Sequence, residues 1–529
     1  IGVPNSMHSA DILIQTLQLL GTRYLFSLSG NQIMPLYDAR IDSNVGFLHV
    51  RHEAAAVNMA DAWGRLTGTP GVALLAAGPG QANAISAMYV ALMAESPVLV
   101  LSGHAPLNAL GHGPFQEMSQ VEMAAPVTKA SWLVREPDRI GDEIRKAFRL
   151  ASNGRSGPVH LSLPVDVLES EVTEVGLAER ESAVEGTVHQ LGPEFFEDLM
   201  KAIYAAERPL ILAGPALMRS DTFRKAASTF AEAGLPLVGM ESPRGVFDPT
   251  LGAFSEVLAE ADLLVLLGKK LDFTLRLGQA PFISPRAFLI QIDSEPSVLA
   301  LTERNASDRL QLLRLEQSDS EHALGTLARV LQNGPPVSSE WAEEVAQAIS
   351  FRPPQWNDLR SQEGEALHSA EVGQAIDAFL RESRDSFFVS DGGEFGQWMQ
   401  ACVSIPRRVI NGPSGAIGGA IPFALAARLA FPSTRIVACS GDGAFGFHPF
   451  EFDTAVRYNL PFIAVIGNDA CWNAEYQIQL RNYGKGRAKG CDLLPSAYHE
   501  VTRALGAWGR HIRHSRELAA ALLAADESG

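Results

Sequence analysis

Two acidic turns in the last third of the sequence have the residue types and the spacing to hold a divalent cation and a diphosphate. The apolar run RIVAC ends in the turn SGDG, which contains Asp442, and the next apolar run, LPFIAVI, ends in the turn GND, which contains Asp469. Because parallel strands bring their carboxyl ends to one edge of a sheet, we expect the two carboxylates to lie side by side. Carboxylate oxygens are the ligands that magnesium prefers, and magnesium takes further oxygens from water and phosphate.

The glycines of the first turn favour the diphosphate part of this prediction. Gly441 and Gly443 flank Asp442 and have no side chain to keep a phosphate away from the backbone N–H groups. The helical stretch HPFEFDTAVRYN that follows could add the positive end of a helix. A GDG turn alone is commonly a solvated strand end. The prediction of a cation–diphosphate site therefore depends on the second acidic turn, one helix and one strand later.

A glutamate in the first block of the sequence is a third candidate for chemistry. Glu53 lies in RHEAAA, between the strand-like run GFLHV and the helical pattern AAAVNMADAWGR. An isolated Glu in the first turn of a helix is favourable simply because of the helix dipole. The residue types alone therefore leave Glu53 open between a structural role and a chemical one.

Short apolar strands alternating with helices must position these residues. The strand-like runs fall into three blocks: GVALLAA and PVLVLSG, then PLILAG, DLLVLLG and AFLIQID, then SFFVS, RIVAC and LPFIAVI. Continuous apolar strands separated by helical patterns, such as ANAISAMYVALMAE at 82–95, are typical of parallel sheets covered on both faces. Linker-like stretches at 168–193 and 333–365 separate the blocks. We therefore predict three doubly wound α/β domains, at residues 1–170, 190–335 and 365–529.

Composition narrows the partners and the compartment. The net charge of −17 disfavours a nucleic-acid partner, which would require a basic patch. No apolar stretch reaches the roughly 20 residues needed to cross a bilayer, and the N-terminal residues lack the pattern of a secretory signal. The four cysteines form no C-x-x-C pair, which disfavours a zinc site and a disulfide framework. We expect a cytoplasmic protein that acts on a small molecule, with no nucleic-acid or membrane partner.

The acidic turns resemble the cofactor motif of the thiamine diphosphate-dependent decarboxylase and carboligase superfamily, which begins with GDG and ends in a pair of Asn. Here Asp469, 27 residues after Asp442, replaces the second Asn, and a carboxylate there can still bind magnesium. The resemblance implies thiamine diphosphate and a Mg²⁺ held by Asp442, Asp469 and the main-chain oxygen of Cys471. It covers nearly the whole chain and implies a pyrimidine-binding, a central and a diphosphate-binding domain.

RHEAAA resembles the glutamate motif of the same family, which implies that Glu53 is the catalytic residue. Thiamine reacts as a carbanion, and a carboxyl group on N1′ of its aminopyrimidine lets the 4′-imine take the C2 proton, so the glutamate is a proton relay. In SGAIGG, Ile417 matches the residue that bends the cofactor, and Gly415 matches the carbonyl that holds the 4′-amine. The positions implied to contact the cofactor are Gly78, Asn83, Gly393, Glu394, Gly415, Ile417, Gly441, Asp442, Gly443, Ala444 and Asp469.

In this family the glutamate of one subunit meets the cofactor of another. The resemblance therefore implies a homodimer at minimum, and commonly a homotetramer. Two other classes fit less well. A non-catalytic relative would have lost the glutamate, and a nucleotide-binding oxidoreductase would need a G-x-G-x-x-G turn, of which the sequence holds no convincing copy.

Weaker matches suggest residues that contact the substrate. SGNQ at 29–32 occupies the place of a PGG loop in acetolactate synthases, and PFQE at 114–117 matches their AFQE segment. Loop packing is an equally good interpretation of both. Residues that follow the second acidic turn could roof the pocket. The candidates are Gly30, Asn31, Gln32, Phe115, Gln116, Trp472, Glu475 and Gln477.

Other features differ from acetolactate synthase. Ile478 stands where that enzyme has a Trp, and the central block lacks its Gly-rich insert and FDDR run, which disfavours FAD. GKKLDFTLRLG and GNDACWN look more like benzaldehyde lyase and 2-hydroxyacyl-CoA lyase. We therefore predict a C–C lyase or carboligase of the 2-hydroxyacyl-CoA lyase type, with an acetolactate synthase-like carboligase acting on pyruvate as the alternative. An acyl-CoA needs a site for its nucleotide (ADP) moiety. The candidate cations for such a site are Lys269, Lys270, Arg276 and Arg286. An ordinary solvated surface is the simpler interpretation of these four residues.

Overall fold

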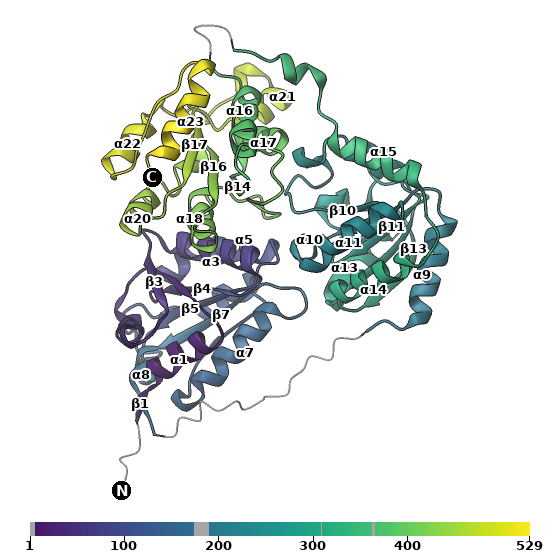
Figure 1. Cartoon of the computed structure of the whole chain (residues 1–529). Coiled ribbons are helices and arrows are strands. Elements are labelled where there is room, and N and C mark those ends of the chain that lie inside the picture. Colours follow the sequence, from purple (N-terminus) through teal and green to yellow (C-terminus); the bar gives the residue numbers. More distant parts are fainter. Residues whose placement is uncertain (1–5, 174–189, 308, 362–365) are drawn as a thin grey trace. The chain divides into compact units, whose positions relative to one another are not determined.

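The computed structural model describes residues 6–173, 190–307, 309–361 and 366–529. It contains three parallel sheets whose strands alternate with helices, so the predicted class of three α/β domains is confirmed (Figure 1). The chain separates into two compact units, one formed by residues 1–182 with 359–529 and the other by residues 183–358. The first unit holds an N-terminal and a C-terminal sheet, and the second unit holds the central sheet.

The N-terminal sheet has six parallel strands in the order β3-β2-β4-β5-β7-β6. Every residue of β4 is buried, as expected for a strand covered on both faces. A short antiparallel pair, β1 (Met7–His8) with β8 (Glu171–Val172), lies apart from it. The six strands are β2 (Tyr24–Ser27), β3 (Gly46–His49), β4 (Gly71–Leu75), β5 (Val98–His104), β6 (Ala130–Leu133) and β7 (Pro158–Pro164).

The helices of this part begin and end at residues suited to those positions. In α3, the His52 ring accepts the Ala54 N–H at the start, and Gly68, with φ of 70°, ends the helix in the left-handed conformation. The single helix expected at 82–95 is wrong, because the chain breaks at Ala84 into two helices. The helices are α1 (Ser9–Leu19), α2 (Met34–Ala39), α3 (Glu53–Thr67), α4 (Pro79–Asn83), α5 (Ile85–Met93), α6 (Gln120–Ala124), α7 (Ile140–Ser152) and α8 (Val165–Glu169).

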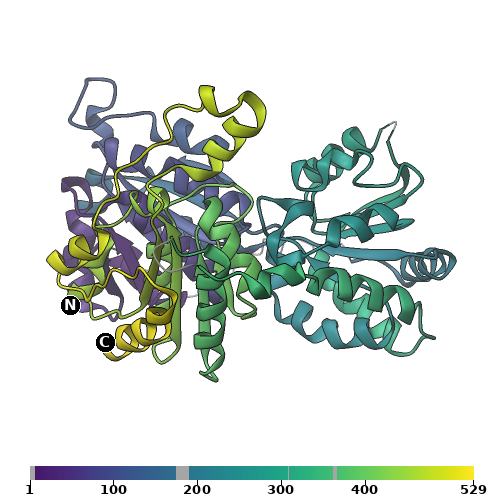
Figure 2. The same ribbon diagram turned by 90° about the horizontal axis from the view of Figure 1, so that it is seen from above.

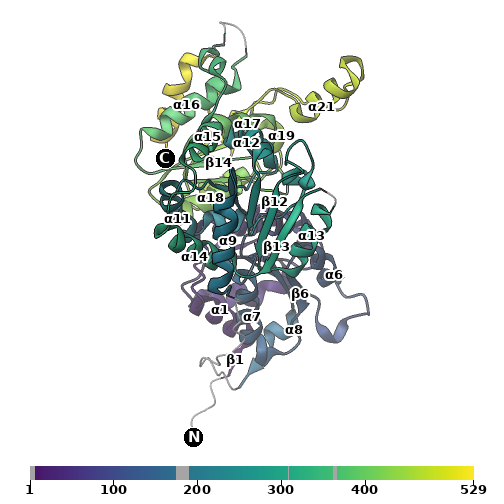
Figure 3. The same ribbon diagram turned by 90° about the vertical axis from the view of Figure 1, so that its right-hand side faces the viewer.

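The C-terminal sheet has four parallel strands in the order β15-β14-β16-β17. They are β14 (Ser386–Ser390), β15 (Arg408–Ile410), β16 (Arg435–Gly441) and β17 (Ile463–Gly467). The helices are α16 (Ser369–Arg381), α17 (Gly393–Cys402), α18 (Ala420–Ala430), α19 (Asp442–Phe445), α20 (Glu451–Arg457), α21 (Asn473–Tyr483), α22 (Tyr498–Ala504) and α23 (Leu518–Glu527). Figure 3 shows α21 standing clear of the sheet that it follows.

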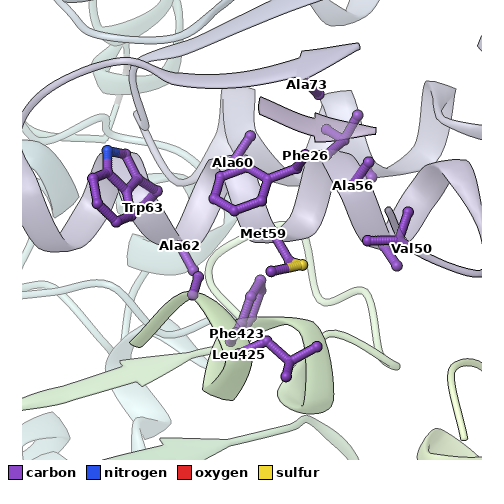
Figure 4. Close-up of a cluster of buried hydrophobic side chains, with 14 of the residues drawn as sticks. Phe26, Val50, Ala56, Met59, Ala60, Ala62, Trp63, Ala73, Phe423 and Leu425 are labelled. Carbon is purple, nitrogen blue, oxygen red and sulfur yellow. The ribbon is translucent and has the colours of Figure 1, made fainter. Parts of the chain in front are cut away.

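One apolar core joins the two sheets of the first unit. Met59 and Trp63 of α3 belong to the same buried cluster as Phe423 and Leu425 of α18 (Figure 4). Both helices are rich in alanine, which lets their backbones approach closely. The helix that begins at Glu53 is therefore packed directly on the C-terminal half of the same unit.

A buried ion pair at the other end of α3 adds a polar link. Arg65 donates from Nε to Asp61 Oδ1 at 2.8 Å and from a terminal nitrogen to the carbonyl oxygen of Ile410 at 2.7 Å. Its guanidinium also lies 5.2 Å from the ring centre of Phe423. A buried charge is tolerated only when it is paired and hydrogen-bonded, and here both conditions hold.

The second unit carries a five-stranded parallel sheet in the order β10-β9-β11-β12-β13, with helices above and below it in Figure 2. Its strands are β9 (Pro209–Ala213), β10 (Leu237–Gly239), β11 (Leu263–Leu267), β12 (Phe288–Asp293) and β13 (Gln311–Gln317). Its helices are α9 (Pro193–Ala205), α10 (Pro215–Arg219), α11 (Asp221–Glu232), α12 (Phe254–Glu260), α13 (Pro296–Ala306), α14 (Ser320–Gln332) and α15 (Ser339–Ser350).

The predicted linkers and boundaries stay predictions. Much of the stretch 168–193 lies outside the described residues, and the stretch 333–365 includes α15. The four cysteines are free thiols. In the described residues, no helix combines the length and the apolar character needed to cross a membrane.

Candidate active site

The glutamate half of the candidate site lies at the carboxyl edge of the N-terminal sheet. Glu53 is the first residue of α3 and is only 8% exposed. Its Oε2 accepts a hydrogen bond from Asn83 Nδ2 at 3.0 Å. A Cβ on Gly80 would lie 3.2 Å from Oε1, so the glycine keeps space beside this oxygen. The structure thus brings together two residues, Glu53 and Asn83, that the sequence assigned to one cofactor.

Gly78 sits next to the predicted substrate segment 114–117. It has φ of 58°, and a Cβ there would lie 2.8 Å from the carbonyl oxygen of Gln116. Gln116 itself has φ of 61°, a conformation that costs energy in a residue with a side chain. Phe115 is 70% exposed, on a loop where the Glu117 carboxylate accepts the N–H groups of Gly111 and Gly113.

The segment 30–32 reaches the same edge. A Cβ on Gly30 would lie 2.4 Å from Cβ of Ala76, which comes two residues before Gly78. Gln32 is buried, and its Oε1 has no hydrogen-bond partner among the described residues. Asn31 begins a short 3-10 helix at Asn31–Ile33 and is exposed. These residues therefore line the glutamate half, with one polar atom available to a ligand.

The two acidic turns meet as predicted at the carboxyl edge of the C-terminal sheet. β16 and β17 are neighbours, with Gly441 opposite Gly467. Burial raises the pKa of Asp442, and the negative charge of Asp469 raises it further. Burial also raises the pKa of Asp469, whose carboxyl contacts the Asp442 side chain.

This pair is chemically incomplete without a cation. Asp442 Oδ2 is buried and finds no hydrogen-bond partner in the part of the chain that the structure describes. A divalent cation would satisfy that oxygen and offset the repulsion between the carboxylates. No group of three His, Cys, Asp or Glu side chains suited to a metal occurs among the described residues, so further ligands must be main-chain, water or phosphate oxygens.

Cys471 is held next to these turns by its backbone. It forms an isolated β-bridge with Asp492, through the bonds from Trp472 N–H to Cys491 and from Leu493 N–H to Ala470. Those bonds leave the carbonyl oxygen of Cys471 outside the bridge. Burial raises the pKa of its thiol, so the side chain stays protonated near neutral pH.

The backbone of the GDG turn is packed so closely against its surroundings that position 443 requires glycine. A Cβ on Gly443 would lie 2.7 Å from the ring of Trp472. Ala444 is buried within α19, directly after Gly443. The Trp472 ring therefore lies directly against the GDG turn, and its predicted contact with the substrate stays a prediction.

Asp391 organises the loop that carries Ile417. Its buried carboxylate accepts the N–H groups of Gly392 and Gly418 at 2.9 Å and of Ala420 at 3.2 Å. Burial nevertheless raises the pKa of Asp391, against the effect of these donors. A Cβ on Gly392 would lie 2.9 Å from Ile417 Cγ2. The sequence signal for this role was the DGG turn at the end of β14, whose acid was not assigned.

The remaining cofactor candidates surround this loop. Gly393 and Gly415 have φ of 79° and 71°, a region that favours glycine. Glu394 Oε1 accepts a hydrogen bond from Trp398 Nε1 at 3.2 Å. The Glu394 carboxylate is therefore partly engaged within its own helix.

Models of three protein domains match the chain in order. They are the thiamine pyrophosphate enzyme N-terminal TPP binding domain at residues 7–123, the central domain at 196–308, and the C-terminal TPP binding domain at 391–529. The chain belongs to the thiamine pyrophosphate enzyme family. It is a thiamine pyrophosphate-dependent enzyme, and both matched binding domains contain the residues described above.

Curated relatives in this family carry two different names. The chain is 30% identical to a probable acetolactate synthase of Mycobacterium bovis, over 99% of this chain and 94% of the relative. It is 29% identical to human 2-hydroxyacyl-CoA lyase 2, over 96% of this chain and 86% of the relative. A probable acetolactate synthase large subunit of Methanocaldococcus jannaschii is 25% identical over 91% of this chain. These similarities place the chain in the family without separating the two activities.

The two halves of this family site lie on different sheets of one chain. In the described residues, the structure records no hydrogen bond or ion pair between Glu53 and the C-terminal sheet. The segment before Glu53 does contact helix α20 of the C-terminal part, because Arg51 donates its N–H to Glu451 at 3.0 Å and pairs with Asp453 at 3.2 Å. The sequence did not predict this contact, because the two acids in HPFEFD resemble ordinary acids on the surface of a helix.

A histidine pair lies beside the same contact. The rings of His52 and His448 have centres 5.5 Å apart, and burial lowers the pKa of His448 to about 4. His448 Nδ1 is buried without a partner among the described residues. The imidazole is therefore neutral near pH 7 and faces the residue that precedes Glu53.

The candidates on α21 are solvent-facing in this family member. Glu475 and Gln477 are exposed, and Gln477 donates to Asn473 Oδ1 at 3.1 Å. Ile478 is 43% exposed. The structure does not bring these side chains into contact with Glu53 or the acidic turns within one chain.

The central-block cations are mostly engaged within the second unit. Lys269 is 4% exposed and donates to Thr274 Oγ1 at 2.5 Å. The Arg276 guanidinium lies 4.8 Å from the ring centre of Phe247 and 5.1 Å from that of Phe282. Lys270 is half-buried and Arg286 is exposed. This set does not form a cluster of open cations.

Proposed function

We propose that this thiamine diphosphate-dependent enzyme is a C–C bond lyase or carboligase of the 2-hydroxyacyl-CoA lyase type. The observation that carries the catalytic part is the buried carboxyl of Glu53 at the start of α3, held by Asn83 in a TPP binding domain. A carboxyl kept from water at that place suits proton exchange, whereas a non-catalytic relative has no need of it.

The chain's own residues divide the work in this proposal. When bound, the cofactor supplies a carbanion that attacks or leaves a carbonyl carbon. Glu53 would exchange a proton with the aminopyrimidine of the bound cofactor, and Asn83 orients the Glu53 carboxyl. Asp442 and Asp469 would hold Mg²⁺ together with the main-chain oxygen of Cys471. Asp391 fixes the loop of Ile417, which would press on the cofactor.

An exposed basic segment after the acidic turns, residues 470–493, supports an acyl-CoA substrate. The segment 470–493 is closed at its base by the Cys471–Asp492 bridge and cross-linked by two hydrogen bonds between Gln479 and Lys489. Among the described residues, its cations are exposed and form no ion pair: Arg481, Lys485, Arg487 and Lys489. In a chain with a net charge of −17, this is a local positive surface suited to phosphates.

The position of this basic segment fits the length of an acyl-CoA. The 11 residues of α21 span about 16 Å, so the cations lie roughly that far along the helix from the metal turn. A phosphopantetheine arm covers a comparable length. Its diphosphate can therefore meet Arg481 and Arg487 while the acyl end reaches the cofactor. The central-block cations are the alternative nucleotide site, and FAD is not part of the proposal.

An acetolactate synthase-like carboligase acting on pyruvate is the second candidate. It is favoured by the 30% identity to the mycobacterial protein. The replacement of its entrance Trp by Ile478 favours the lyase instead.

We further propose that the enzyme works as a homodimer or homotetramer. Exposed apolar side chains in the first unit support burial by a second copy, among them Phe115 at 70% exposure and Phe447 and Phe450 at 54%. A cytoplasmic location remains a prediction from the sequence.

Mass spectrometry of a substrate panel tests the proposed activity. With thiamine diphosphate and magnesium, we expect cleavage of a 2-hydroxyacyl-CoA to an aldehyde one carbon shorter and formyl-CoA, and no acetolactate from pyruvate. Robust acetolactate formation would reject the lyase. In the double variant R481E/R487E, the KM for the acyl-CoA should rise about tenfold with little change for an aldehyde acceptor. The matched control R503E changes a cation that already pairs with Glu500.

A further inference from the structure

A buried glutamine contacts α4, the helix that bonds Glu53, and its side-chain amide lies inside a polar network. Gln120 is the first residue of α6 (Figure 3) and is 1% exposed. It follows the substrate segment 114–117 but does not touch Glu53. A fully buried amide is costly unless its hydrogen bonds are satisfied, so its partners show what it holds in place.

The oxygen side of Gln120 holds α4. Its Oε1 accepts the N–H of Gly78 at 2.6 Å, and its main-chain oxygen accepts a hydrogen bond from Gln81 Nε2 at 3.3 Å. Because Gly78 precedes the first residue of α4, the helix is held at its start and in its middle. The same helix carries Asn83, which donates to Glu53 Oε2, and Gly80, whose missing side chain leaves space beside Oε1.

The nitrogen side of Gln120 ties the amide to the sheet. Its Nε2 lies 2.9 Å from Ser102 Oγ and from the carbonyl oxygen of Gly103, and 2.8 Å from Ser162 Oγ. These residues belong to β5 and β7, which are neighbouring strands of the N-terminal sheet. The donors and acceptors on each side leave the amide one orientation, with oxygen towards Gly78.

A neutral histidine completes the network. His160 on β7 places Nε2 2.7 Å from Ser102 Oγ and Nδ1 2.8 Å from Ser131 Oγ. Burial lowers the pKa of His160 to about 3, so the ring carries no charge at working pH. The network is therefore hydrogen-bonded and uncharged, and it does not compete with Glu53 for protons.

We propose that Gln120 is a positioning residue for proton exchange at Glu53. It fixes α4 against the sheet, and α4 in turn sets the Asn83–Glu53 hydrogen bond and the clearance beside Oε1. The proposal rests on the proposed role of Glu53 as the proton relay. It predicts that loss of the amide slows activation of the cofactor even though Gln120 touches neither the cofactor nor the glutamate.

The rate of C2 hydrogen–deuterium exchange in enzyme-bound thiamine diphosphate, measured by acid quench and NMR without substrate, tests this idea. Q120M keeps the side-chain length and removes both hydrogen-bonding functions. We expect exchange at least about tenfold slower than wild type, because small displacements of a catalytic group have large effects. Q120E keeps an acceptor for Gly78 and should restore part of the rate.

The control is S131A, which damages the same network at the end far from Gly78. At equal thermal stability, S131A should keep the wild-type exchange rate while Q120M does not. Equal rates in the two variants would reduce Gln120 to a structural residue and overturn the proposal. If Q120M does not fold, S162A serves instead, with exchange about two- to threefold slower expected and a wild-type rate counting against the idea. A wild-type rate in E53Q would instead show that the proposed function is wrong, whatever Gln120 does.

Discussion

The two halves of the candidate site differ in how far the chain satisfies its own polar groups. At the glutamate half, Glu53 is bonded to Asn83, and Gly78 to Gln120. At the diphosphate half, Asp442 and Asp469 face each other with raised pKa values, and Asp442 Oδ2 has no partner among the described residues. In the glutamate half the acid is already held by a hydrogen bond within the fold, and among the described residues Gln32 Oε1 and Gln81 Oε1 are the buried atoms left for a ligand or water. In the diphosphate half the acid itself has an unpartnered oxygen, which a bound cation would satisfy.

The largest effect should come from the glutamate half, where the acid is already held within the fold. In E53Q, an amide oxygen can still accept the hydrogen bond from Asn83, so the fold and the thermal midpoint should not change. Turnover should fall by about 100-fold or more, because the amide cannot exchange a proton. Steady-state kinetics with a melting curve measure both. E122Q, which removes an exposed carboxylate from α6, is the control, and wild-type turnover in E53Q would end the relay hypothesis.

The diphosphate half should respond differently to loss of an acid. D442A removes the unpartnered Oδ2 but also the hydrogen bonds that the carboxyl accepts from the backbone at Gly443 and Ala470, so the stability of the protein without cofactor should change little. The thermal stabilisation by thiamine diphosphate with magnesium should disappear, and calorimetry should show cofactor affinity at least about tenfold weaker. The control D526A removes the partner of Arg435 at the opposite end of β16. An unchanged thermal shift in D442A would refute the ligand role.

A smaller change at the second turn sharpens the comparison. D469N keeps an oxygen ligand but removes one negative charge, so magnesium affinity should fall about three- to tenfold with turnover retained at saturating magnesium. The cofactor-free protein should melt at a higher temperature, because the repulsion from Asp469 that raises the pKa of Asp442 is gone. Titration calorimetry tests the expected fall in magnesium affinity, and melting curves test the expected rise in melting temperature. An unchanged magnesium affinity would show that Asp469 behaves as the family's Asn does.

The smallest effect concerns stability at low pH. There, His160 and the acidic pair Asp442 and Asp469 change the free energy of unfolding in opposite directions. His160 titrates near pH 6.5 in the unfolded chain and near 3 when folded. As pH falls from 6.5 towards 3, the unfolded state gains a proton that the folded state excludes. The free energy of unfolding therefore drops by at most about 1.4 kcal/mol per pH unit. The raised pKa values of Asp442 and Asp469 act with the opposite sign, since the folded state then holds the extra protons.

Urea unfolding of H160Q between pH 4 and 7 separates these contributions. The variant should show a shallower loss of stability with acidification than wild type, although its stability at pH 7 is lower. D442A, measured in the same way, should show a steeper loss. Identical slopes in H160Q and wild type would place the acid sensitivity elsewhere in the chain.

Sequence patterns predicted the parts of this molecule that depend on local periodicity and on short motifs. The apolar runs that became β4, β9, β11 and β16 are visible because parallel strands covered on both faces need continuous apolar residues. The meeting of Asp442 with Asp469 followed from the rule that neighbouring parallel strands end at one edge. The break at Ala84 was not visible, because ANAISAMYVALMAE carries a helical pattern throughout and only Glu53 and Gln120 give α4 a separate position.

The sequence by itself determined the fold class, the acidic turns and the candidate glutamate, because strand periodicity and motif spacing are local properties. Only the tertiary structure decided which ordinary residues support them. Gln120 lies 42 residues from Gly78, and Arg65 lies 345 residues from Ile410, yet each pair forms a buried hydrogen bond. A buried polar group is stable only beside a matching partner, and which partner that is depends on how the sheets and helices pack.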